Sequence, residues 1–146
     1  MRRPSVNIWL LVRALMLVLG MLSANSFVPS PQSPFVGGSI TLLLVFFVFG
    51  VISMVFVLGL QATNPRSAAV WTKPDWHENP FSLKQPLQFF HMSGYYLIAA
   101  GGGAIVLAHI RHLSGLEPLL PIALGVGVLV GIRCCELLYR RKFGSP

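Results

Sequence analysis

The chain is poor in charged residues, and one long stretch has none. From Ala14 to Pro65 there is no Asp, Glu, Lys, Arg or His, and charged residues make up only 10% of the whole chain. A soluble domain of this size is still largely surface and cannot bury so long a Leu-, Val- and Phe-rich run. Because one membrane crossing needs about 20 apolar residues, the run is long enough for two crossings. We therefore predict an all-α integral membrane protein.

The sequence also lacks the residue patterns of common enzymes. No Ser/His/Asp or Cys/His arrangement, Gly-rich phosphate loop or zinc-ligand spacing is present. Asp75, His77 and Glu78 are neighbours in a polar loop, where we expect solvated side chains and no metal. The formal net charge of +7 comes from basic residues that flank apolar segments, without a basic and aromatic stripe. This placement argues against nucleic-acid binding and indicates membrane topology.

Four segments are long and apolar enough to cross a bilayer, and they predict a single four-helix transmembrane domain over residues 1–146. The fourth is the weakest, because Arg133 interrupts it and leaves an apolar run short enough for a re-entrant segment. A full crossing is expected, since apolar residues continue beyond Arg133 and its side chain can reach the headgroups. The predicted spans are residues 8–24, 40–60, 87–110 and 119–138, with a cytoplasmic loop over 61–86.

The basic residues predict the orientation. With a cytoplasmic N-terminus, ten of the 11 Lys and Arg residues lie inside and only Arg111 lies outside. We therefore predict that both termini are cytoplasmic, in a bacterial cytoplasmic (inner) membrane. Arg2 and Arg3 precede the first span, as basic residues precede the apolar region of a signal peptide. Because Arg13 interrupts its apolar region and Leu22 is unfavourable for cleavage before the loop, we expect an uncleaved span.

The third and fourth spans carry a signal for close helix packing. Their connection is short, so they are expected to form an antiparallel hairpin. Gly127 and Gly131 have the GxxxG spacing at which membrane helices approach closely. These glycines either pack within the chain or contact another subunit or a second copy. The Gly101–Gly103 triplet should weaken the third helix locally.

The cytoplasmic loop is rich in aromatic residues. Trp71, Trp76 and Phe81 stand among charges and prolines. Indole rings in such a place are typical of a headgroup-level belt. Tryptophan on a proline-ordered backbone is also typical of a partner-binding surface, so both interpretations remain open.

His91 and His109 suggest b-type haem as a possible kind of cofactor. They lie five helical turns apart, on one face and about 27 Å from each other. Two b-type haems, one near each membrane surface, would each need a second axial ligand, and no other span contains a histidine. The second ligands would be a histidine of another chain or the methionines Met16, Met21 and Met54. Otherwise the histidines are interfacial or hydrogen-bonded, for example to Tyr95 or Tyr96.

A transporter needs charged groups along its path. Glu136, near the cytoplasmic edge of the fourth span, is the carboxylate that could serve this purpose. Arg13 could pair with it if the first and fourth spans are neighbours, or Arg133 could pair with it at i, i+3 spacing.

These patterns favour a small multi-pass membrane protein with no enzymatic activity and no cofactor. We expect an accessory, assembly or adaptor subunit whose partners are the lipid bilayer and other membrane subunits, or a second copy. A b-type haem electron-transfer protein using His91 and His109 is the first alternative. A small transporter is the second.

Overall fold

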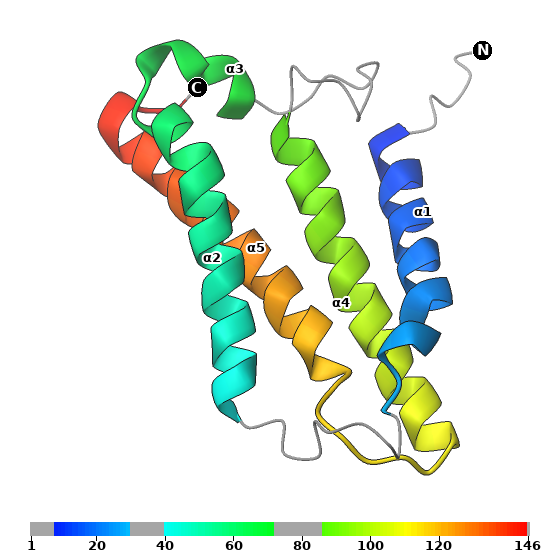
Figure 1. The fold of residues 1–146 in the computed structure, drawn as a ribbon. Helices are drawn as coiled ribbons and strands as arrows, with labels where there is room; N and C mark the ends of the chain where they lie inside the picture. The colour runs from blue at the N-terminus through cyan, green and yellow to red at the C-terminus, as the bar shows by residue number, and fades with distance from the viewer. Residues whose placement is uncertain (1–7, 30–39, 72–85, 146) are drawn as a thin grey trace, which may run out of the picture.

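The computed structural model describes residues 8–29, 40–71 and 86–145. Within these ranges every regular element is helical (Figure 1). The elements are α1 (Ile8–Ser23), η1 (Ala24–Phe27), α2 (Ile40–Ala62), η2 (Pro65–Ser67), α3 (Ala68–Trp71), α4 (Pro86–Ile110) and α5 (Leu119–Phe143). The predicted site residues Trp76 and Phe81 lie outside the described ranges.

Four helices are long and apolar enough to cross a membrane: α1 with η1, α2, α4 and α5. The 23 residues of α2 correspond to about 34 Å at 1.5 Å per residue, against a hydrocarbon core of about 30 Å. These helices confirm the all-helical prediction with four candidate spans, and they fit an integral membrane protein. α5 continues to Phe143, five residues past the predicted end at 138, because its final basic residues remain helical.

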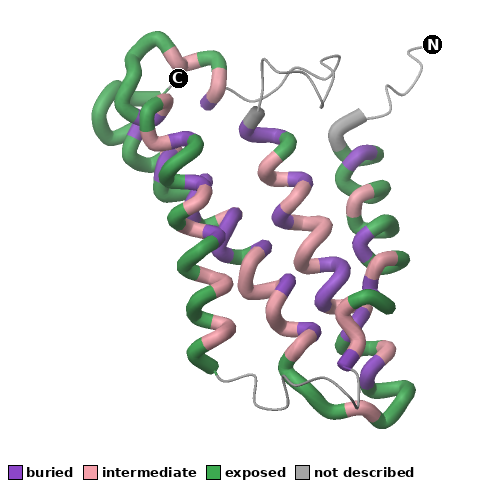
Figure 2. The backbone as a smooth tube through the Cα atoms, in the orientation of Figure 1, coloured by how far each residue is buried: buried purple, intermediate pink, exposed green. Residues whose placement is uncertain are grey.

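The four long helices form an open row and not a closed bundle. The order across the row is α1, α4, α5, α2, with the extensive contacts between successive members (Figure 1). The edge helix α2 has only 11% of its span buried inside the chain, against 39% for α5 (Figure 2). Phe56 of α2 is 84% exposed. Such uncovered apolar surface suits contact with lipid or with another helix.

α2 and α5 approach closely through glycines on both helices. A Cβ on Gly131 would lie 2.7 Å from the Cβ of Met54, and one on Gly127 would overlap the backbone of Phe47. On the other side, a Cβ on Gly50 would lie 2.7 Å from the carbonyl oxygen of Leu124. The GxxxG pair therefore faces α2 of the same chain. A partner-binding role for Gly127 and Gly131 stays a prediction.

Three consecutive glycines in α4 face three different surroundings. A Cβ on Gly101 would overlap Ile122 of α5, and one on Gly103 would lie 2.8 Å from the Cβ of Ala24 in η1. A Cβ on Gly102 would meet nothing within 4 Å. The helix continues unbroken through the triplet, so the local weakening expected from glycine does not end it.

α4 ends in a left-handed turn. His112 has φ +54°, its N–H donates to the carbonyl of His109, and the N–H of Leu113 donates to the carbonyl of Ala108. This is the Schellman pattern of a helix C-terminus. Nearby, Arg111 donates to the side-chain oxygen of Asn25 at 3.0 Å, which ties this end of α4 to η1.

Candidate functional site

The segment after α2 folds back onto the end of the row. The side-chain oxygen of Asn64 accepts a 2.9 Å hydrogen bond from the N–H of Arg66, which begins the η2 turn. The Ser67 hydroxyl bonds the carbonyls of Gln61 and Asn64. It also accepts a 3.3 Å hydrogen bond from the indole N–H of Trp71. These local bonds fix the position of the indole.

Trp71 is buried within the chain. Only 4% of it is exposed, and its ring stacks on Tyr139 of α5 with centroids 5.7 Å apart. The Tyr139 hydroxyl donates to the carbonyl of Pro65 at 3.4 Å. Trp71 therefore closes the junction of α2, α3 and α5. Whether Trp71, Trp76 and Phe81 also bind a partner stays a prediction.

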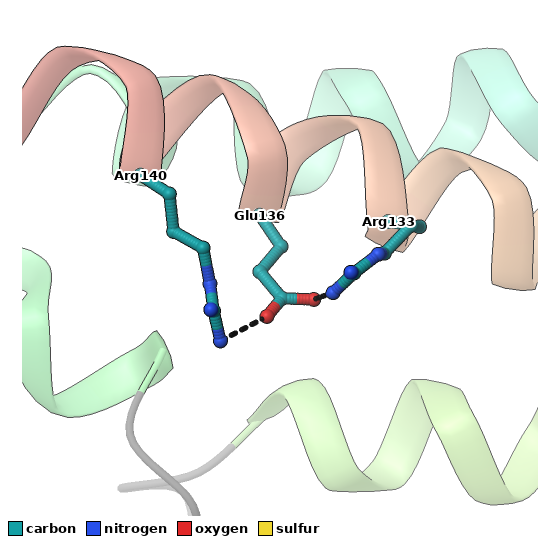
Figure 3. Close-up of polar contacts among 3 residues, drawn as sticks. All are labelled: Arg133, Glu136 and Arg140. Carbon is teal, nitrogen blue, oxygen red and sulfur yellow. Dashed lines mark hydrogen bonds and ion pairs between the residues drawn. The ribbon is translucent and has the colours of Figure 1, made fainter. Parts of the chain in front are cut away.

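Three charged side chains project from one side of α5 near its C-terminal end (Figure 3). A guanidinium nitrogen of Arg133 lies 2.6 Å from one oxygen of Glu136, and one of Arg140 lies 2.7 Å from the other oxygen. We call these three residues the α5 charged cluster. The Arg133–Glu136 pair is the i, i+3 alternative expected from the sequence. The rival pairing of Glu136 with Arg13 needed α1 beside α5, and α4 lies between them.

The cluster continues the face of α5 that packs on α4. Further from this end, Gly125 lies against the Gly94 carbonyl, and Leu129 lies over the open side of Gly94. Residues 125, 129, 133, 136 and 140 follow the i, i+4, i+3 spacing of one helical stripe. The stripe therefore changes from small and apolar to charged where it nears the end of the row.

His91 lies at the same end of α4. It is half-buried, and the centre of its ring lies 6.4 Å from that of Tyr95. Tyr96, the other expected partner, instead donates to the Ser23 hydroxyl at 2.6 Å.

His91, Gly102 and His109 share one face of α4, because at 100° per residue they fall within roughly 20° of each other. This face lies between the sides that contact α5 through Gly101 and the α1 side through Gly103. We call the three residues the open α4 face. Met16 packs between Val12 and Met92, and Met54 lies in the α2–α5 core, so both are engaged elsewhere. Among the described residues no group of three or more His, Cys, Asp and Glu could hold a metal ion.

The sequence prediction paired Glu136 with Arg13 or Arg133 and missed Arg140. The signal that could have found it is its i+4 spacing from Glu136. No protein-family model matches the chain, and no curated protein or solved structure matches it either. The class of protein therefore follows from the fold itself, whose four apolar helices fit an integral membrane protein.

Proposed function

We propose that the protein is a non-enzymatic accessory, assembly or adaptor subunit of a larger membrane complex. The observation that supports this is the uncovered Gly102 at the middle of α4 in an open helix row. Small residues at mid-membrane are typical of places where helix backbones approach. Gly101 allows close contact with α5, and Gly103 allows close contact with η1 of the same chain. Gly102 offers the same close approach to a helix of another subunit.

The proposal includes the orientation that the sequence predicts. Both termini lie in the cytoplasm of a bacterial cell, and α4 and α5 form an antiparallel hairpin. The start of α1 and the end of α5 lie at one end of the row (Figure 1), which supports this topology. Most described cations lie toward that end, whereas Arg111 lies at the other. The cations toward that end are Arg13, Arg66, Arg133, Arg140, Arg141 and Lys142.

Crosslinking in native membranes followed by mass spectrometry tests the subunit role. A photo-crosslinking residue replacing Val106, beside Gly102 on an exposed part of α4, should join a defined neighbouring membrane protein. Gly102→Leu should abolish that crosslink by filling the approach. The matched control is Gly59→Leu, since Gly59 has only Val55 of its own helix within 4 Å.

The control variant should leave the crosslink unchanged. Two results contradict the proposal: the protein crosslinks to nothing but lipid and runs alone after gentle solubilisation, or Gly102→Leu leaves its neighbours in place. A crosslink lost equally in both variants would show a general folding effect and also count against the role of Gly102.

The open α4 face also supports a second candidate, b-type haem electron transfer. His91 and His109 lie on the same face as an uncovered glycine, which leaves room for a flat ring against the helix. With Met16 and Met54 packed inside the chain, the opposing axial ligand would come from Met21 or a second copy. An absorption spectrum of the purified protein without a Soret band rules this candidate out. The transporter hypothesis, which rests on Glu136, stays a prediction.

A further inference from the structure

We propose that the α5 charged cluster, together with Arg141 and Lys142, binds the headgroup of an anionic phospholipid. The inference depends on the helices crossing a membrane, but not on a partner subunit. It assigns to these residues a binding role beyond the setting of topology.

Arg133 and Arg140 both pair with Glu136 and both remain partly exposed to a ligand. Glu136 is largely covered, with 17% of its side chain exposed, while Arg133 is 60% and Arg140 is 41% exposed. Each guanidinium carries five N–H donors, and each directs one nitrogen at the carboxylate. Both side chains keep substantial exposed surface beyond these ion pairs. A fixed pair of guanidinium groups suits a phosphate, which accepts paired N–H donors.

The charge at this end of α5 is not balanced within the described chain. Arg133, Arg140, Arg141 and Lys142 stand against the single carboxylate of Glu136. Arg141 and Lys142 are exposed, and the Lys142 ammonium lies 5.4 Å from the centre of the Phe143 ring. The excess positive charge attracts anionic lipid, each basic residue near such a surface adding about 1 kcal/mol.

The position of the α5 charged cluster distinguishes it from basic residues that only flank a membrane span. Arg133 lies seven residues before Arg140, about 10 Å deeper along the helix axis. It occupies the stripe of α5 that packs on α4 further down. Basic groups beside a helix–helix contact at the membrane surface are typical of lipid headgroup sites. The acyl chains would then lie along the exposed apolar surface of the row.

Binding should be measured on the purified full-length protein in neutral detergent, by titration with phosphatidylglycerol, phosphatidylcholine or inorganic phosphate. We expect selective binding of phosphatidylglycerol. Arg140→Gln should weaken it about fivefold, the loss expected for one basic contact. Arg66→Gln is the matched control, because it removes the same charge from an exposed residue at the same end without touching Glu136. It should change the affinity by less than twofold.

Glu136→Gln gives a change of the opposite sign. It removes the negative charge that opposes an anionic headgroup, while the amide oxygen can still accept a hydrogen bond and help to position the guanidinium groups, so the affinity for phosphatidylglycerol should rise severalfold. A purely structural role for Glu136 predicts no gain. This variant keeps the test decisive if Arg140→Gln does not fold.

Three outcomes overturn the proposal. Equal affinity for the anionic and the zwitterionic lipid would show that charge is not recognised. Comparable binding of inorganic phosphate would show a site for small anions only. Equal losses in Arg140→Gln and Arg66→Gln would show a general charge effect. Each measurement uses the isolated chain, so its failure is distinct from the absence of a partner subunit.

Discussion

The indole of Trp71 stacks on the phenol ring of Tyr139 at a centroid distance of 5.7 Å. This contact joins the short helix after α2 to the last turns of α5. The Tyr139 hydroxyl reaches the Pro65 carbonyl on the same side, so two contacts hold the two chain segments together. The buried cluster around them includes Leu58 and Ile132, both fully covered.

Replacing Trp71 should destabilise this end of the row. Trp71→Ala removes a large buried side chain, and we expect a loss of about 3 kcal/mol in the free energy of unfolding. Tyr139→Phe removes one long hydrogen bond and keeps the ring, so its loss should stay below about 1 kcal/mol. Unfolding in mixed micelles with increasing SDS measures both values. Equal effects would mean that ring stacking contributes little here.

Gly131 of α5 and Gly102 of α4 should respond to alanine with opposite signs. Gly131→Ala places a Cβ 2.7 Å from that of Met54, and we expect a loss of about 1 to 3 kcal/mol. Gly102→Ala meets no neighbour and raises helix propensity, so it should stabilise the isolated chain by up to about 1 kcal/mol. The same unfolding measurement compares them. A stabilising Gly131→Ala would contradict the close α2–α5 contact.

Tyr96 and Ser23 should show a measurable coupling. Their hydroxyls are 2.6 Å apart and connect α4 to α1. A double-mutant cycle of Tyr96→Phe and Ser23→Ala should give a coupling of about 0.6 kcal/mol, the average for hydrogen bonds between membrane helices. As a control, Ser53→Ala removes only a bond to its own helix, at Phe49. A coupling energy of zero would contradict the contact between Ser23 of α1 and Tyr96 of α4.

Labelling of single cysteines tests the orientation. In a background with Cys134→Ser and Cys135→Ser, a membrane-impermeant thiol reagent should label Ser114→Cys from outside intact cells. If the basic ends are cytoplasmic, as the charge distribution predicts, Arg66→Cys and Phe143→Cys should react only after the cells are opened. Labelling of Arg66→Cys and Phe143→Cys from opposite sides would refute the four-span topology.

The long apolar runs made the helices predictable from the sequence. Which helices lie side by side was not predictable. α2 begins at Ile40, where the Pro- and Gly-rich sequence gives way to a long apolar run. The order of the row carries no such signal, since apolar residues surround α2 on every side and no face is marked for burial. The α5 helix continues past residue 138, the predicted end of the membrane span, for a related reason. Arg140 and Lys142 are good helix formers, so charge ended the apolar run without ending the helix.

The candidate sites were predictable only where spacing along one helix determines contact. The i, i+3 rule gave the Arg133–Glu136 pair, and five helical turns gave the common face of His91 and His109. The burial of Trp71 depends on its contact with Tyr139, which lies far away in the sequence. A tryptophan of a headgroup-level belt would stand in a similar sequence, so the sequence does not distinguish the two cases. GxxxG spacing likewise shows that a helix can approach, but not which helix does.

Gly101 and Gly103 allow α4 to approach its two neighbours independently. Gly101 sets the distance to α5, and Gly103 sets the distance to α1 and η1. A larger side chain at Gly101 would push α5 outward and carry α2 with it, since α2 packs on α5. The same change at Gly103 would displace only the α1 edge. The width of the row can therefore be altered on one flank at a time, while Gly102 between them changes neither distance.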